Sequence, residues 1–227
     1  FQYIVCLFAS MFCSILVVVT FNFLYRYFAV VMPQRIRLFS TAWFPVCLVL
    51  LAFLVCAVWY TDCYFFYVAT VEGRATVAAD FKQKYGLDSM AHAIVMADYW
   101  REDHYDTRPI IGVAIFFIII ASGFAFMVYC TVSILRYLSQ AKAISLRTRR
   151  LQYALFRTLT VQTIVPVVFL HANCGVTILL PLFGVDISMF CDWISVACSC
   201  FPPFDALATI LLMRDYRQTV CSMILCR

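Results

Sequence analysis

A basic segment between two long apolar runs is the feature that most constrains what this chain can fold into. Residues Arg136–Arg157 hold six basic side chains and no acid, and apolar runs of membrane length, Pro109–Ser133 and Ala154–Leu180, flank them. Lys and Arg are retained on the cytoplasmic side of membrane proteins. A nucleic-acid-binding stripe on a soluble domain is excluded, because flanks this apolar would not stay in water. The pattern predicts an inner connector, residues 136–157, between two transmembrane helices.

The composition agrees with a chain that lies mostly in lipid. Of the 227 residues, 65% are hydrophobic and 13% are charged, whereas soluble domains have about 45–50% apolar and about 25% charged residues. Too little polar surface remains to cover a soluble core of this size. We therefore expect an all-α membrane protein, with residues 1–227 forming a single transmembrane domain in a lipid bilayer.

Five apolar runs reach or approach the length of roughly 20 residues that a transmembrane helix needs. We place these spans at about residues 3–24, 43–60, 109–135, 154–180 and 189–213. An odd number of spans puts the N-terminus outside and the C-terminus inside. Because the chain opens within an apolar run, we interpret it as a fragment that lacks two earlier spans, and seven spans would leave both ends on the same sides.

The fourth of these runs is the most polar and the most easily bent. It contains Pro166, which cannot donate a main-chain hydrogen bond and therefore predicts a kink. The run also carries Gln162, His171 and Asn173. We predict these three side chains as candidate ligand contacts, and hydrogen bonding between helices is the alternative role.

Residues 61–108 reverse the charge pattern of the basic segment. They carry eight acids, Asp62 among them, and five basic residues, which indicates the outer side. A loop of this length without structure would be unusual. Thr76, followed by Gly86 after one helical stretch, predicts a short capped helix, and Asp88 is a candidate cap for a second. We expect this outer loop to form a lid over a binding site, with a solvated loop as the alternative.

Enzyme signatures are absent from the sequence. There is no G-x-S-x-G, no H-E-x-x-H and no glycine-rich phosphate loop. The three histidines are scattered and the twelve cysteines contain no C-x-x-C pair, so we expect no metal site, no cofactor and no catalysis. Four cysteines near the outer side are candidates for a disulfide, whose pairing the sequence leaves open: Cys6, Cys63, Cys174 and Cys191.

Charged side chains inside or at the ends of the apolar runs are costly and are therefore candidates for function. Arg26 closes the first run, either as an anchor whose charge reaches the interface or as part of an inner site. Asp205 lies in the last run, where structural hydrogen bonding is the alternative to a functional partner on another helix.

The sequence resembles one known family, most specifically in its last seventy residues. Residues 155–187, LFRTLTVQTIVPVVFLHANCGVTILLPLFGVDI, are similar to the sixth span of nematode serpentine chemoreceptors of the Str and Srj type. Residues 201–220, FPPFDALATILLMRDYRQTV, resemble the end of their seventh span. Residues 23–30, FLYRYFAV, resemble the end of their third span, and residues 63–87 resemble their second outer loop.

The resemblance implies a seven-helix, G-protein-coupled receptor for odorant-type ligands. A small molecule would bind among the outer halves of the first, fourth and fifth runs, and a heterotrimeric G protein would bind at the basic connector. The implied location is the plasma membrane of a sensory cilium. The resemblance also assigns four residues to G-protein coupling or an inner switch: Arg26, Asp205, Tyr216 and Arg217.

The sequence departs from the family pattern at three places, and two other classes of membrane protein stay open. The outer half of the fourth run lacks a proline that is common there. Ala206 stands where the family usually has Pro, and Tyr25 precedes Arg26 where the larger rhodopsin-like group has an acid. An arginine switch locked by that acid is therefore not carried over. A transporter would show inverted repeats, of which we find none. A ligand-gated channel would need a polar stripe along its pore, which only the fourth run approaches.

Overall fold

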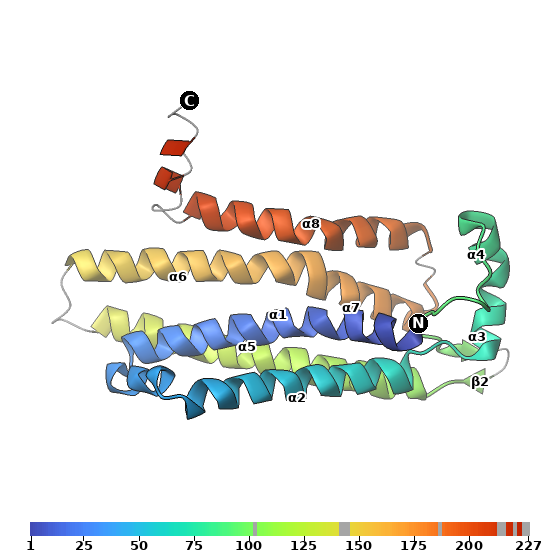
Figure 1. Cartoon of the computed structure of the whole chain (residues 1–227), viewed down its shortest axis with the longest axis horizontal. Helices are drawn as coiled ribbons and strands as arrows, with labels where there is room; N and C mark the ends of the chain where they lie inside the picture. The colour runs from blue at the N-terminus through green and yellow to red at the C-terminus, as the bar shows by residue number, and fades with distance from the viewer. Residues whose placement is uncertain (102–103, 141–145, 186–187, 213–216, 220–221, 224–227) are drawn as a thin grey trace. The chain divides into compact units, whose positions relative to one another are not determined.

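The computed structural model describes residues 1–101, 104–140, 146–185, 188–212, 217–219 and 222–223, and these are mainly helical (Figure 1). The long helices are α1 (Gln2–Val30), α2 (Trp43–Phe66), α5 (Arg108–Gln140), α6 (Leu146–Pro166) and α8 (Ser188–Leu212). The short elements are η1 (Pro33–Ser40), α3 (Val71–Thr76), α4 (Ala78–Tyr85), η2 (Val167–His171), α7 (Ala172–Leu179) and η3 (Leu180–Phe183). Two strands of two residues, β1 (Trp100–Arg101) and β2 (His104–Tyr105), pair antiparallel.

Helices of membrane length confirm the prediction of an all-α membrane protein. Among the described residues, four helical runs are long and apolar enough to cross a bilayer: α1, α2, α5 and the continuous run Thr148–Phe183. These match four of the five predicted spans. The fifth predicted span falls on α8, in which Val196–Leu212 is a shorter apolar stretch.

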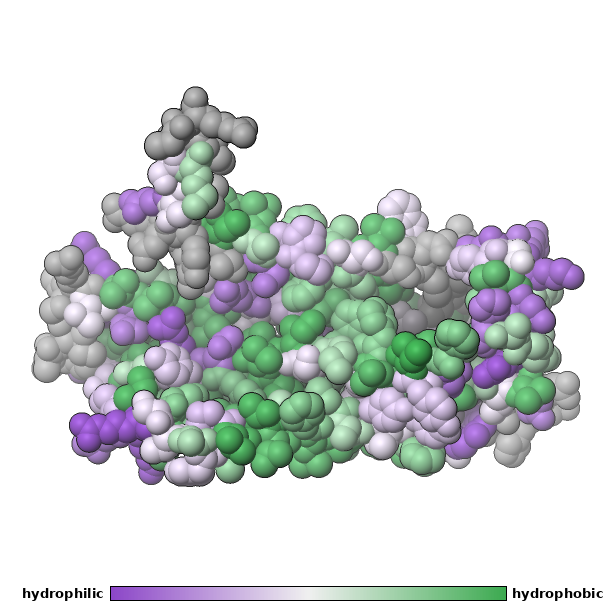
Figure 2. All heavy atoms as spheres, in the orientation of Figure 1, coloured by the Kyte–Doolittle hydropathy of each residue, from purple (hydrophilic) through white to green (hydrophobic). Residues whose placement is uncertain are grey.

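The exposed side chains of α2 are those of a helix that faces lipid. Leu50, Phe53 and Leu54 are 60%, 69% and 60% exposed. An apolar surface of this extent is unfavourable in water, whereas in a bilayer it needs no cover. The visible face in Figure 2 agrees, because apolar side chains cover the long helices and hydrophilic ones gather over α3 and α4.

The contacts within the chain group its residues into two compact units, which we describe separately. Unit 1 holds Phe1–Val18, Trp43–Phe124 and Val176–Ile187, and unit 2 holds Val19–Ala42, Ala125–Gly175 and Ser188–Arg227. Helices α1 and α5 run without a break from residues of one unit to residues of the other. The expectation of one transmembrane domain stays a prediction.

The core of unit 1 is built where α1, α2 and α5 approach one another. The indole Nε1 of Trp59, on α2, donates to the carbonyl of Ala9, on α1, at 3.1 Å. The Trp59 ring also lies 5.0 Å from the ring of Phe116, on α5. Close approach needs a missing side chain at Gly112, because a Cβ there would lie 2.9 Å from both Phe66 Cβ and Tyr67 Cζ.

The core of unit 2 includes the packing of α6, η2 and α8 against one another (Figure 1). The rings of Phe169 and Phe204 stack at 4.9 Å with an interplanar angle of 18°. Within the same unit, Phe23 of α1 meets Phe156 of α6 edge to face at 6.4 Å. Aromatic contacts thus link three helices of the unit.

Two boundaries differ from those expected from the sequence. The basic segment 136–157 is largely helical, since α5 runs to Gln140 and α6 begins at Leu146, and residues 141–145 lie outside the described part. Likewise α2 runs to Phe66, so the predicted outer loop begins about two turns later than residue 61. Both differences have one cause: an apolar run marks the part of a helix in lipid, and the helix continues beyond it where no Gly or Pro ends it.

A π turn directly follows Pro166, where the sequence predicted a kink. Residues Val167–His171 form a π-helix, in which the N–H of Ala172 bonds to the carbonyl of Val167, five residues earlier. Pro cannot donate a hydrogen bond, and π turns within α-helices are a recognised way to absorb such a break. The fourth run is therefore divided into α6 and α7 by a turn of different pitch.

We predict that Gly112→Ala lowers stability by about 1–3 kcal/mol, because the added methyl group overlaps the side chains of Phe66 and Tyr67. Gly175→Ala is the matched control, since no atom lies within 4 Å of a Cβ at Gly175, and a helical Gly→Ala change by itself gains up to about 1 kcal/mol. Thermal unfolding in detergent, followed by labelling of the buried Cys6, Cys63 and Cys130, measures both. An unchanged melting temperature for Gly112→Ala would contradict the packing described.

Candidate functional site

The segment between α2 and α5, residues 67–107, is folded, and we call it the cap segment. Its first residues pair with a later stretch of the segment: Ala69 N donates to Ile94 O at 3.1 Å, and Met96 N donates to Tyr67 O at 2.7 Å. Helices α3 and α4 lie between these paired stretches. The expectation that a loop of this length would carry structure is confirmed, and its role as a lid over a binding site stays a prediction.

The caps within this segment differ in part from those predicted. Gly86 ends α4 in the left-handed conformation with φ 67°, as expected. Thr76 does not begin α4; it is the last residue of α3, and Thr70 is the cap, accepting a hydrogen bond from Gly73 N at 3.2 Å. Asp88 begins a turn instead of a helix, since its Oδ1 accepts from Met90 N at 2.9 Å. Short side-chain bonds of this kind suit turns as well as helix caps, so the sequence does not separate the two.

Hydrogen bonds to main-chain carbonyls attach the cap segment to the helix ends of unit 1. The hydroxyl of Tyr99, which is 1% exposed, donates to Ile178 O at 2.7 Å. The indole of Trp100 donates to Pro181 O at 3.2 Å, and Gln2 Nε2 donates to Ile94 O at 3.1 Å. The cap segment is therefore held by α1 at one point and by the α7–η3 region at two others.

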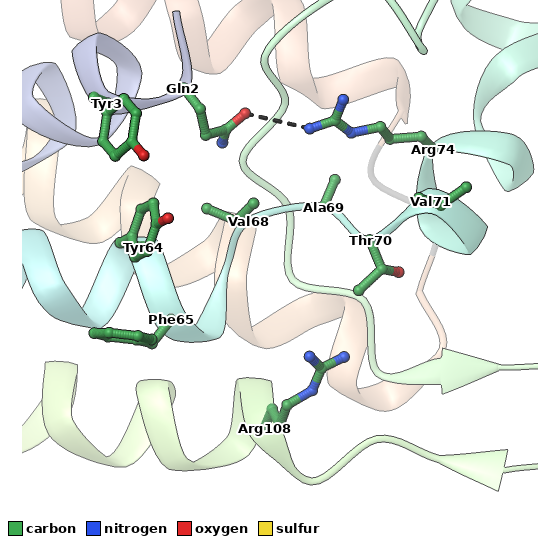
Figure 3. Close-up of a pocket in the computed structure, with 10 residues that line it drawn as sticks. All are labelled: Gln2, Tyr3, Tyr64, Phe65, Val68, Ala69, Thr70, Val71, Arg74 and Arg108. Carbon is green, nitrogen blue, oxygen red and sulfur yellow. Dashed lines mark hydrogen bonds between the residues drawn. The ribbon is translucent and has the colours of Figure 1, made fainter.

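A pocket of about 510 Å³ lies where the cap segment meets the start of α1 and the end of α2 (Figure 3). Its volume lies within the range of small-molecule sites, about 300–1,000 Å³. One wall is aromatic, because the rings of Tyr3 and Tyr64 stack at 5.6 Å with an interplanar angle of 13°. Residues 68–71 form another part of the lining, and Arg74 and Arg108 bring two guanidinium groups.

The two guanidinium groups differ in their surroundings. Arg108 is 50% exposed and forms a forked ion pair with Asp106, with Nη2 donating to Oδ2 at 2.7 Å and Nε to Oδ2 at 3.1 Å. Arg74 reaches from α3 towards α1, where its Nη2 lies 3.5 Å from Gln2 Oε1 (Figure 3). No acidic side chain lines the pocket among its described residues.

Asp62 lies inside the protein, not in the solvated outer loop that its charge suggested. It belongs to α2 and is 2% exposed, and neither carboxylate oxygen has a hydrogen-bond partner among the described residues. The hydroxyl of Tyr67 nearby, on a ring that is 3% exposed, has no partner either. Burial raises the pKa of the Tyr67 phenol above its usual range, with the charge of Asp62 adding to the effect. Unpaired buried polar groups are costly, which marks this pair as a functional candidate.

The sequence held a signal for the position of Asp62. The apolar run resumes directly after it as Cys63-Tyr64-Phe65-Phe66-Tyr67, so the acid interrupts a buried pattern and does not end it. The pocket itself gave no such signal. Its residues come from α1, α2, the cap segment and the first residue of α5, which only the fold brings together.

The three ligand contacts predicted from the fourth run belong to unit 2, whereas the pocket belongs to unit 1. His171 Nδ1 lies 3.1 Å from Pro166 O, and Asn173 Nδ2 donates to Phe169 O at 2.7 Å. Both side chains therefore bond to main-chain carbonyls in and around the π turn. Gln162 lies on α6 and is half-buried. A ligand role for these three stays a prediction.

Of the residues assigned to the inner side, three are described. Arg26 is half-buried near the end of α1, Asp205 is half-buried in α8, and Arg217 is exposed. Within the described part of the chain, Asp205 has no hydrogen bond or ion pair. Tyr216 lies outside the described residues. Their coupling role stays a prediction.

Three of the four candidate disulfide cysteines have described side chains. Cys6 and Cys63 are buried, and Cys174 is half-buried. The side chain of Cys191 lies outside the described part. Within that part, no group of three His, Cys, Asp or Glu side chains is placed to hold a metal ion.

The fold defines a multi-pass helical membrane protein, in which a pocket lies where the cap segment of unit 1 meets α1 and α2. The family model of the serpentine type 7TM GPCR chemoreceptor Str matches residues 1–221. The chain therefore belongs to the Str family of serpentine chemoreceptors.

Individual relatives agree with this assignment. Serpentine receptor class r-10 of Caenorhabditis elegans is 29% identical over 222 residues, which cover 94% of this chain and 64% of the relative. The G-protein coupled receptor str-33 of the same organism is 27% identical over 231 residues, 99% of this chain and 67% of the relative. Serpentine receptor class J-38 is 28% identical over 203 residues, 88% of this chain and 61% of the relative. The chain thus spans about 64% of the first of these relatives. No solved structure matches it.

We predict that Asp62→Asn raises the melting temperature of the purified chain by a few degrees, because it removes a charge that no described group compensates while keeping nearly the same volume. Asp80→Asn, at an exposed position of α4, is the control and should change it little. Differential scanning fluorimetry in detergent measures both. A lower melting temperature for Asp62→Asn would mean that a partner group or ion stabilises the charged carboxylate.

Proposed function

We propose that the chain is part of a chemosensory G-protein-coupled receptor that takes a small ligand into the pocket beneath the cap segment. Family membership favours this function over the transporter and the ligand-gated channel. The observation that carries the proposed site is the pocket of about 510 Å³ between the cap segment and the ends of α1 and α2. A cap attached by hydrogen bonds at its edges admits a ligand by releasing one of them, without unfolding the helices.

The aromatic wall suits a ligand with an apolar body. Tyr3 and Tyr64 present two stacked rings, and Phe65 and Val68 add apolar area. A small molecule gains affinity in such a site by leaving water, while a few polar groups fix its orientation. The polar groups here are the hydroxyl of Thr70, the amide of Gln2 and the guanidinium of Arg74.

A ligand signal has continuous helices along which to travel. Tyr3 belongs to α1, whose later residues belong to unit 2 and include Arg26. Arg108 is the first residue of α5, which likewise runs on into residues of unit 2. A ligand favours the state to which it binds more tightly, so a shift of α1 at Tyr3 would bias the position of its far end.

The π turn in the fourth run is the proposed point of bending. His171 and Asn173 hold the carbonyls of Pro166 and Phe169, so exchange of these bonds would change the pitch of the run locally. Phe169 also stacks on Phe204 of α8, which ties the turn to the last helix. π turns are frequent at functional sites.

On the proposed cytoplasmic side, basic residues would bind the G protein. Arg26, Arg217 and the segment 136–157 supply positive charge for an acidic or dipolar partner, such as a helix C-terminus of a heterotrimeric G protein. Asp205 and Tyr216 are the other proposed coupling residues. The receptor would lie in the plasma membrane, in a sensory cilium, with the cap segment outside.

The pocket is tested by comparing Tyr64→Ala with His171→Ala. Cells that express the receptor are screened with small volatile and water-soluble compounds, with G-protein nucleotide exchange as the readout. For any compound that activates the receptor, we predict that Tyr64→Ala raises the half-maximal concentration about tenfold or more, because one half of the aromatic wall is lost. Unchanged dose–response curves for Tyr64→Ala at equal surface expression would exclude this pocket, and shifted curves for His171→Ala and Asn173→Ala would place the ligand near the fourth run.

The sidedness is tested with inserted tags. A tag at Gly86, where no atom lies within 4 Å of a Cβ, should be labelled on intact cells if the cap segment is outside. A tag at Lys142, in the basic segment, should be labelled only after permeabilisation, because Lys and Arg are retained inside. The opposite pattern would reject the receptor proposal, since a G protein would then face the wrong side.

A further inference from the structure

The pocket contains one arginine that no acid neutralises. Arg74 donates to Met90 O at 3.4 Å and to Gln2 Oε1 at 3.5 Å, both long for hydrogen bonds, whose usual N···O distance is about 2.9 Å. Its Nε is buried and has no hydrogen-bond partner. Among the described residues, no carboxylate forms an ion pair with Arg74.

The second arginine of the pocket provides the comparison. Arg108 holds both oxygens of Asp106 at 2.7–3.3 Å, and the carboxylates of Asp98 and Glu72 act on it electrostatically. Its charge is thus balanced within the protein. Among the described residues, Arg74 bonds only to two neutral carbonyl oxygens, so the described lining of the pocket has a net positive charge.

The distribution of acids makes this difference informative. Residues 61–108 carry eight acids, yet none of the pocket's described lining residues is acidic. An arginine in such a segment has many acids within reach along the chain, and the fold directs Arg74 towards neutral Gln2 instead (Figure 3). A partly buried guanidinium without an anion is unfavourable, so an anion that enters the pocket would be stabilised there.

The geometry of the unsatisfied donors indicates which kind of anion. Nε and Nη2 form one edge of a guanidinium, and this edge binds the two oxygens of a carboxylate in parallel. In Arg74, Nε has no partner and Nη2 has only the bond of 3.5 Å to Gln2. In the same pocket, the stacked rings of Tyr3 and Tyr64 offer an apolar surface.

We propose that Arg74 anchors the carboxylate of a small anionic ligand whose apolar body lies against Tyr3 and Tyr64. The inference rests on the proposed function and adds the chemical class of the ligand. The carboxylate would replace Gln2 at Nη2 and would reach the buried Nε once the side chain turns towards the pocket. Because Arg keeps its charge at all physiological pH values, the site would select for the ionised form of the ligand.

The test uses two pairs of probes that match in size and differ in charge: benzoate with benzamide, and hexanoate with hexanamide. The melting temperature of the purified chain in detergent is measured with each probe at millimolar concentration, since a ligand that binds the folded state raises it. We expect both carboxylates to raise it and both amides to have little effect. The shift should be lost in Arg74→Gln, measured against that variant's own melting temperature without probe.

Lys82→Gln is the matched control, because Lys82 is an exposed cation of α4 that does not line the pocket. It should retain most of the shift. Arg74→Lys keeps the charge but lacks the two parallel N–H donors of the guanidinium. Its affinity for the carboxylates should therefore fall about tenfold while its folding is preserved. If Arg74→Gln does not fold, Arg74→Lys decides the question.

Equal shifts with carboxylates and amides would overturn the inference and leave the proposed pocket in place. Carboxylate shifts that persist in Arg74→Gln would also overturn it, because the anion would then bind elsewhere. The inference is also overturned if neither carboxylate raises the melting temperature and only anionic lipid does, since the anion would then be a lipid phosphate. The proposed function fails by a separate result, namely unchanged dose–response curves in Tyr64→Ala.

Discussion

The structure of unit 1 depends on how polar groups at the ends of membrane helices find partners within the protein. The last carbonyls of a helix have no partner in the helix itself, and in or near lipid an unpaired carbonyl is costly. Here the hydroxyl of Tyr99 and the indole of Trp100 donate to the carbonyls of Ile178 and Pro181, at and just beyond the end of α7. The same bonds fix the cap segment, so one set of interactions completes a helix end and holds this segment in place.

Among the described residues, few buried side-chain atoms lack a hydrogen-bond partner, and these lie in or next to the proposed site. Within the described part of the chain, the buried side-chain atoms without a partner belong to Asp62, Tyr67 and Arg74. Arg74 lines the pocket, and Asp62 and Tyr67 lie at the end of α2 next to the residues that line it. A receptor that is to be stabilised by its ligand has reason to keep such groups unsatisfied, because a group already paired contributes nothing further when the ligand arrives.

The fourth run shows a second use of an unsatisfied backbone. Pro166 cannot donate to the carbonyl one turn earlier. A π turn follows it, and His171 and Asn173 contact the carbonyls of Pro166 and Phe169. Such a turn has alternative hydrogen-bond patterns of similar energy, which a regular helix lacks. The stacking of Phe169 on Phe204 connects this adaptable turn to α8.

The sequence by itself determined the fold class, four helices of membrane length and the family. These depend on local sequence, because apolar runs become helices in lipid and the placement of charges predicts their orientation. It also located the irregular turn, since Pro166 acts on its own helix. It misplaced Asp62, Thr76 and the helix ends, because an acid, a threonine or a polar helical turn has the same local pattern whether it is buried or solvated. The pocket was decided by tertiary structure alone. Tyr3, Tyr64, Arg74 and Arg108 meet through contacts between residues far apart in the chain, and no local pattern encodes which donors remain unpaired when they meet.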